Sequence, residues 1–129
     1  MAISLTSLQS SAANSPPRIL TYGVAGVGKT TFATSAPGAV VVPTEDGLGT
    51  ITAPRFPLAK SFEAVMEALA ALYSEPNEFK TVVIDSVDWL EPLVWQRACT
   101  DNGWASIEEP GYGKGYIAAL DLWRQYLEG

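Results

Sequence analysis

Three short apolar runs mark the expected strands of this chain, at residues 19–22, 39–42 and 81–84. None of them alternates polar and apolar residues, as a strand with one solvated face would. Continuous apolar runs are typical of strands that are covered on both faces, which is the situation in a parallel sheet. The pattern therefore predicts three parallel strands.

Apolar residues recur at helical spacing between and after these runs. Ser61 can cap a helix whose apolar positions are Phe62, Val65, Met66, Leu69, Leu72 and Tyr73. Pro92 suits the first position of a short helix that reaches Cys99. Residues 116–127 predict a further helix whose apolar stripe is formed by Tyr116, Leu120, Trp123 and Leu127. Strands that alternate with helices predict an α/β fold, a parallel sheet with helices on both faces.

The length and the composition fit one domain after a polar arm. The chain has 129 residues, of which 47% are hydrophobic, so one globular core is expected. Residues 1–17 contain five serines and close on Pro16 and Pro17, which favour an extended chain. We therefore expect a disordered arm at 1–17 and a single domain at 18–129.

Charge and residue content exclude several classes of protein. Eight basic against 14 acidic residues give a net charge of -6, which argues against a broad basic face for duplex nucleic acid. With no histidine and one cysteine, the chain cannot build a Ser-His-Asp or Cys-His catalytic site or an internal disulfide. No apolar run approaches the roughly 20 residues that span a bilayer, so no membrane contact and a cytoplasmic location are expected.

A phosphate-binding loop follows the first expected strand. Residues 23–30 match the pattern G-x-x-x-x-G-K-[ST] between a strand and a helix, where such a loop must lie. Its amides can point at phosphate oxygens, Lys29 adds a charge for the β and γ phosphates, and the Thr30 hydroxyl can ligate Mg²⁺. Thr31 is placed to contact the α phosphate. The expected nucleotide-binding residues are Gly23, Val24, Ala25, Gly26, Val27, Gly28, Lys29, Thr30 and Thr31.

Two acidic residues complete the expected catalytic site. Asp85 ends the third apolar run, where a carboxylate can hold Mg²⁺ through water opposite Thr30; the alternative is a cap for the following turn. The next residue is Ser86, so the base that activates water must come from another strand. Glu45 follows the second run at the ligand-binding edge of an α/β sheet and is the candidate base, the alternative being a solvated loop carboxylate. Asp88 is a weaker candidate because it suits the cap of the next helix.

A second glycine-rich segment, GYGKGY at residues 111–116, precedes the last helix. Its tyrosines and Lys114 could contact single-stranded bases, and Tyr112 and Lys114 are the candidate contacts to DNA or to another subunit. The alternative is a flexible helix entry whose tyrosines pack into the core.

The segments YGVAGVGKTTFA, VPTEDGLG and KTVVIDSVDWL, followed by GYGKGY, resemble the phage-type RecA-like P-loop ATPases. This group comprises AAA-domain phage nucleotide-binding proteins and includes single-strand-annealing ATPases. The resemblance covers about residues 18–127. It implies a RecA-like sheet, ATP and Mg²⁺ as ligands, Glu45 as the water-activating residue and Asp85 as the residue serving the metal. It also implies a phage protein in its host cell, or a bacterial one.

The resemblance has one gap. RecA-like domains hold a further strand between the loop-bearing strand and the aspartate strand, after the region that corresponds to 116–127. Residues 18–129 are therefore expected to form a partial P-loop domain, incomplete at its C-terminus and without this central sensor strand. The two site-bearing strands would then pair abnormally or leave backbone groups unpaired. ATPase activity is expected of the full domain and is left open for these 129 residues.

The function expected first is Mg-ATP binding and hydrolysis coupled to recombination or annealing of single-stranded DNA, with possible homo-oligomers. Its DNA part follows from the resemblance. A non-catalytic, nucleotide-dependent assembly module is the alternative. A small-molecule kinase is disfavoured because four arginines are few for a lid around two phosphorylated substrates. A regulatory GTPase is disfavoured because no Asn-Lys-x-Asp sequence is present.

Overall fold

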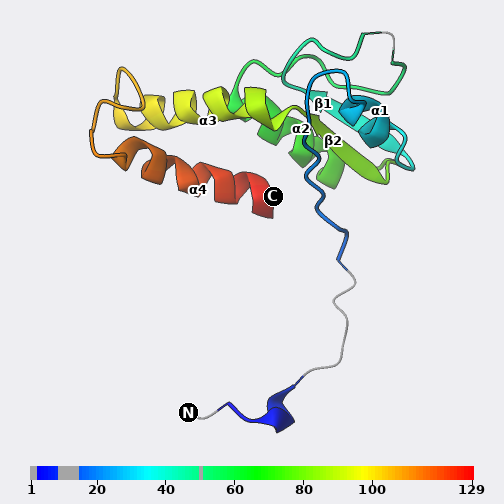
Figure 1. The fold of residues 1–129 in the computed structure, drawn as a ribbon, viewed down its shortest axis with the longest axis horizontal. Helices are drawn as coiled ribbons and strands as arrows, with labels where there is room; N and C mark the ends of the chain where they lie inside the picture. The colour runs from blue at the N-terminus through cyan, green and yellow to red at the C-terminus, as the bar shows by residue number, and fades with distance from the viewer. Residues whose placement is uncertain (1–2, 9–14, 50) are drawn as a thin grey trace.

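The computed structural model describes residues 3–8, 15–49 and 51–129. Along the chain its elements are η1 (Leu5–Ser7), α1 (Lys29–Thr34), β1 (Ala39–Pro43), α2 (Phe62–Ser74), β2 (Thr81–Asp85), α3 (Val87–Asn102) and α4 (Lys114–Glu128) (Figure 1). The disordered arm expected at 1–17 lies partly outside the described residues. Of its described part, residues 5–7 form the single 3-10 turn η1, which buries no side chain.

The two strands form a parallel sheet, as predicted. β1 and β2 pair in register from Ala39 opposite Thr81 to Pro43 opposite Asp85. Residues 54–59 run along the other edge of β1, where the Val41 amide donates to the Pro54 carbonyl at 2.9 Å and the Phe56 amide donates to the Val41 carbonyl at 2.9 Å. β1 is therefore enclosed on both edges, and all five of its residues are buried. The α/β class is confirmed.

The prediction of a strand at 19–22 is wrong. These residues carry no regular secondary structure, and Ile19, Leu20 and Tyr22 are 72%, 73% and 89% exposed. A strand forms where a neighbour takes up its backbone N–H and C=O groups. Within the described residues the sheet consists of β1 and β2 alone, and one edge of β1 is already taken by residues 54–59. The outer edge of β2 takes no further described strand, so the run at 19–22 is unpaired, and its exposed side chains lack a covering layer.

The helix after Ser61 forms as predicted. The Ser61 hydroxyl accepts a hydrogen bond from the Ala64 amide at 3.1 Å, so Ser61 caps the start of α2. Phe62, Val65 and Ala68 are buried and belong to the larger core, together with residues of α3 and α4. This core fixes α3 relative to the sheet and so places the segment that follows Asp85.

α3 starts earlier than predicted. It begins at Val87 with Ser86 as its N-cap residue, so Asp88 lies in the first turn and Pro92 lies inside the helix. Proline inside a helix removes one backbone hydrogen bond. Here the helix continues through Pro92 because Leu90, Val94 and Ala98 lie on one face and are buried in the core. Tertiary packing outweighs the local cost of the proline.

α4 buries a different face from the one predicted. Gly115, Ala119 and Leu122 are buried, whereas Leu120 and Leu127 of the expected stripe are 46% and 50% exposed. Small residues allow close approach: a Cβ atom on Gly115 would lie 1.9 Å from the Ile107 carbonyl oxygen. The glycine and the alanine therefore set the centre of the buried face beside Leu122. Trp123 of the expected stripe packs against the core, whereas Leu120 and Leu127 do not.

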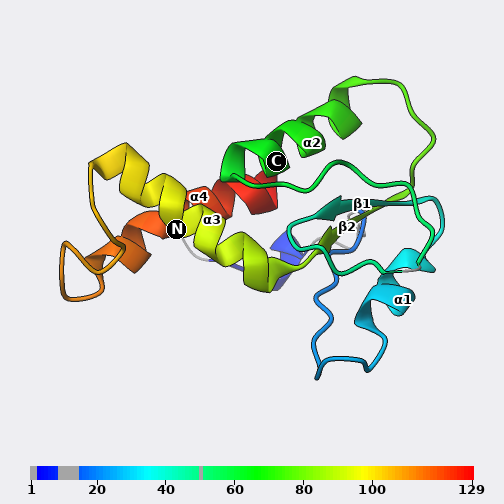
Figure 2. The same cartoon turned by 90° about the horizontal axis from the view of Figure 1, so that it is seen from above.

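α3 and α4 form a hairpin that extends away from the sheet, with residues 103–113 at its tip and α1 at the opposite end of the domain (Figures 1 and 2). In the described ranges no helix is both long and apolar enough to cross a membrane.

Candidate nucleotide site

Residues 23–28 form an exposed loop that leads into α1. Gly26 and Gly28 have φ angles of 81° and 103°, in the left-handed region where a side chain would be strained. Within the loop, the Val27 amide donates to the Val24 carbonyl at 3.3 Å. Among the described residues, the amides of Gly26, Gly28, Lys29, Thr30 and Thr31 donate no hydrogen bond. They are free to receive an anion.

Lys29 folds back over this loop. Its Nζ donates hydrogen bonds to the carbonyl oxygens of Gly23 at 2.7 Å and Val24 at 2.9 Å. The ammonium therefore lies beside the loop, and a bound polyphosphate would exchange these carbonyl contacts for charged oxygens. The phosphate oxygens carry full negative charge, so the exchange adds attraction between opposite charges and is favourable.

Thr30 and Asp85 are 55 positions apart in the sequence and meet in the structure. The Thr30 hydroxyl donates to Oδ2 of Asp85 at 2.8 Å, in a partly buried position. Thr30 lies in the first turn of α1 and Asp85 is the last residue of β2. This bond joins the phosphate-binding loop to the carboxyl end of the sheet.

The donor set at this junction fits Mg²⁺ in a site shared with a nucleotide. Mg²⁺ prefers oxygen ligands and keeps several waters, so one or two protein oxygens plus phosphate oxygens suffice. Thr30 and Asp85 supply two adjacent oxygens. Across the described residues, no group of three or more His, Cys, Asp or Glu side chains could hold a metal alone. The chain would therefore bind the metal together with a phosphate.

Thr44 positions Asp85, a role that sequence analysis missed. Its amide donates to the Asp85 carbonyl at 2.8 Å. Its hydroxyl donates to the Ser86 carbonyl at 2.6 Å and accepts from the Ser86 amide at 2.7 Å. Thr44 is 7% exposed, so these groups have little access to water. The signal in the sequence was a hydroxyl residue at the end of a buried apolar strand, directly before Glu45.

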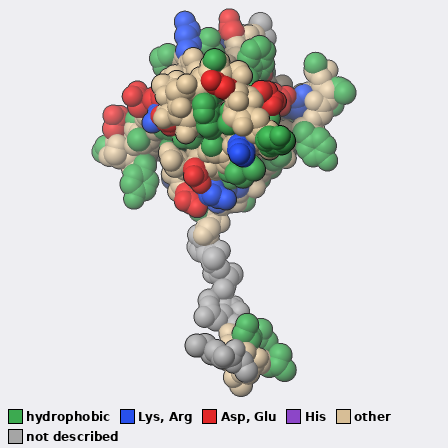
Figure 3. All heavy atoms as spheres, turned by 90° about the vertical axis from the view of Figure 1, so that its left-hand side faces the viewer, with side chains coloured by type: hydrophobic (Ala, Val, Ile, Leu, Met, Phe, Trp, Pro, Cys, Tyr) green, Lys and Arg blue, Asp and Glu red, His purple; other side chains and the backbone are tan. Residues whose placement is uncertain are grey.

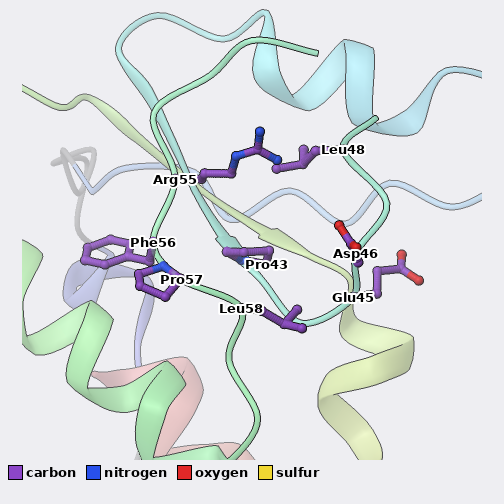
Figure 4. Close-up of a pocket in the computed structure, with 8 residues that line it drawn as sticks. All are labelled: Pro43, Glu45, Asp46, Leu48, Arg55, Phe56, Pro57 and Leu58. Carbon is purple, nitrogen blue, oxygen red and sulfur yellow. The ribbon is translucent and has the colours of Figure 1, made fainter. Parts of the chain in front are cut away.

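Glu45 lies just after β1, at the carboxyl edge of the sheet, and is partly buried. It lines a hollow of about 400 Å³ together with Pro43, Asp46, Leu48, Arg55, Phe56, Pro57 and Leu58 (Figure 4). In Figure 4 the Glu45 and Asp46 carboxylates lie together on one side of this hollow, and Arg55 lies apart from them. The structure gives no hydrogen bond or ion pair between Glu45 and residues 23–31. Glu45 is therefore at the expected edge without direct contact to the loop.

The remaining candidates lie apart from one another. Thr31 is exposed on α1. Tyr112 is 99% exposed, with a φ angle of 52°, at the hairpin tip, and Lys114 begins α4 there. This tip and α1 lie at opposite ends of the domain (Figure 2). Figure 3 views the molecule from the side of the tip and shows acidic, basic and hydrophobic side chains interspersed, without a broad basic field.

Tyr116 of the same segment is held by its neighbours. Its hydroxyl donates to Oε1 of Glu108, and its ring packs edge-on against Trp95 with ring centroids 5.3 Å apart. The hydrogen bond to the Glu108 carboxylate raises the pKa of Tyr116. The two tyrosines therefore differ: Tyr116 packs against Trp95 while staying 37% exposed, outside the core, whereas Tyr112 is 99% exposed.

The comparisons with known proteins give one positive result. A family model described as an AAA domain matches residues 15–129. The comparisons with curated proteins and with solved structures return no match.

Proposed function

The chain belongs to the AAA domain family, whose membership indicates nucleotide binding and hydrolysis, and on this premise we propose that it binds Mg-ATP at residues 23–31 and hydrolyses it. The observation that carries the proposal is the 2.8 Å hydrogen bond from Thr30 to Asp85. Two residues expected to serve one metal from distant parts of the sequence are neighbours in space, next to a loop with free amides. A glycine-rich turn without a binding role would not require Thr30 and Asp85 to be in contact.

Each residue has a separate task in the proposed reaction. The free amides of the loop and Lys29 bind the phosphate oxygens. Thr30 and Asp85 would hold Mg²⁺, which would supply positive charge against the phosphate oxygens. Glu45 accepts a proton from water as the water oxygen bonds to the γ phosphorus and the bond to the ADP oxygen breaks.

Replacement of the proposed base separates binding from turnover. Glu45→Gln should retain ATP affinity within about twofold and lower the rate of phosphate release by about 10²–10⁴-fold, the usual range for loss of a general base. Asp46→Asn is the matched control, because it neutralises the adjacent exposed carboxylate. Phosphate release under saturating Mg-ATP measures the rates. Equal rates in Glu45→Gln and the parent would remove Glu45 from the reaction.

A nucleotide-dependent assembly module is the second candidate. It is favoured by the position of Glu45, which makes no hydrogen bond or ion pair with residues 23–31. In this case the parent binds Mg-ATP and releases no phosphate above the Glu45→Gln background.

A comparison of ATP with GTP in the same assay tests which nucleobase the site prefers. We expect ATP preference or little discrimination, and strong GTP selectivity would contradict an ATP motor.

Coupling to single-stranded DNA is the finer part of the proposal. It is supported by Tyr112, which is 99% exposed, and by exposed Lys114, which together offer a stacking ring and a charge. Tyr112→Ala and Lys114→Ala should each weaken salt-sensitive binding of an oligothymidine, measured by fluorescence anisotropy. Tyr73→Ala, at 91% exposure on α2, is the control for the tyrosine. Unchanged binding in both tip variants would contradict this contact.

A further inference from the structure

α4 has a second apolar face that the fold does not use. Its buried face carries Gly115, Ala119 and Leu122. Ile117, Leu120 and Leu127 lie on the opposite side of the helix, since residues three and seven apart share a face. They are 65%, 46% and 50% exposed. We call Ile117, Leu120, Arg124 and Leu127 the outer stripe of α4.

The outer stripe lies on the side of α4 that is turned away from the buried core residues. On a helix with 3.6 residues per turn, its four residues centre roughly 150° from the buried face. α4 runs along one edge of the domain with α3 beside it (Figure 1). The stripe therefore faces away from the core, where three large aliphatic side chains in a row are unusual for a surface helix.

We propose that the outer stripe is the contact surface for a second copy of this chain, with the two α4 helices antiparallel across a twofold axis. A twofold contact requires a surface that is complementary to itself. In an antiparallel pair centred at the level of Leu122, Ile117 of one copy lies beside Leu127 of the other. Leu120 lies beside the aliphatic stem of Arg124.

The charges on this face fit the same arrangement. Within one copy Arg124 pairs with Asp121 at 2.8 Å, and their side chains are 66% and 77% exposed. Turning the helix about the proposed axis brings Arg124 of each copy next to Asp121 of the other. Asp121 and Arg124 lie about one turn apart, so the helix surface that carries them is complementary to a second copy running in the opposite direction. A parallel pair would place like charges side by side.

The size of the contact predicts a weak dimer. The two copies together contribute six aliphatic side chains from one helix each, less than the interface of a permanent dimer. Association should therefore depend on protein concentration. The stripe does not include residues of the candidate nucleotide site, so the dimer is independent of the proposed function.

The first test is sedimentation of the whole chain without nucleotide, from about 10 µM to about 500 µM. The parent's mass should rise with concentration toward twice 13.8 kDa. Leu120→Glu should weaken dimerisation at least about tenfold by placing a charge in an apolar contact. Gln125→Glu adds the same charge to an exposed position of α4 outside the stripe. This variant should change the dimerisation affinity by less than about twofold. A parent that stays at 13.8 kDa, or equal weakening by both variants, overturns the proposal.

The second test fixes the orientation. In a Cys99→Ala background, Ile117→Cys and Leu127→Cys chains should form disulfide-linked dimers when mixed and oxidised. Each chain oxidised alone should not, because in the antiparallel pair identical positions lie about 15 Å apart along the helix, beyond disulfide reach. Cross-linking of Ile117→Cys to itself, or no cross-link in the mixture, contradicts the antiparallel contact.

Discussion

At the residue scale, Thr44 forms hydrogen bonds with three backbone groups beside the proposed metal position. Thr44→Val keeps the shape of the side chain and removes the hydroxyl that serves both the Ser86 amide and the Ser86 carbonyl. The partly buried Ser86 amide would lose its partner, while the Ser86 carbonyl keeps the Leu90 amide at 3.1 Å, so the free energy of unfolding should fall by about 1–3 kcal/mol. Urea denaturation measures this change, with Thr52→Val at an exposed position as control. Equal stability of the two variants would contradict the positioning role.

The local part of the site could be predicted from the sequence, and its long-range contacts could not. Residues 23–31 form one continuous pattern, because the loop is defined by glycine spacing and by the lysine and threonine that follow. Thr30 and Asp85 were assigned to one metal, and the structure brings them together. The three hydrogen bonds of Thr44 depend on how β1 and β2 end side by side, which no local pattern records.

At the scale of elements, the face that a helix buries depends on small residues as well as large ones. Gly115 meets the Ile107 carbonyl so closely that Gly115→Ala requires the chain to shift. Overpacking of this kind should lower the free energy of unfolding by about 1–3 kcal/mol. Gly47→Ala is the matched control, because its new Cβ would lie 3.7 Å from Glu45, an ordinary contact. Thermal unfolding of both variants checks the prediction, and an unchanged midpoint for Gly115→Ala would contradict it.

The errors in the predicted elements have different causes. The stripe predicted for residues 116–127 counted large apolar side chains, whereas the fold buries a glycine and an alanine. The residues predicted as a strand at 19–22 pair with neither strand of the described sheet, although the outer edge of β2 takes no other described strand. β1 was predicted well because all five of its residues are buried, as a continuous apolar run indicates. β2 and α2 form where predicted but bury less of their patterns: Val82 of β2 is 45% exposed and Tyr73 of α2 is 91% exposed.

At the scale of the whole molecule, the described domain separates two regions. α1, which contains Thr30, and β2, which ends at Asp85, lie at one end of the domain, and the segment between α3 and α4 lies at the other (Figure 1). Tyr112 belongs to that segment. The outer stripe of α4 runs along the hairpin between them. Nucleotide binding, contact at the tip and association of two copies can therefore be changed one at a time by substitution.

The central claim is that residues 23–31 bind a triphosphate and share its Mg²⁺ with Asp85. The most direct measurement is calorimetric titration of ATP into the parent, Lys29→Ala and Asp85→Asn, with and without Mg²⁺. The account predicts that the parent binds more tightly with Mg²⁺, that Lys29→Ala binds at least about tenfold more weakly, and that Asp85→Asn loses the Mg²⁺ dependence. Parent-like binding in both variants would contradict it.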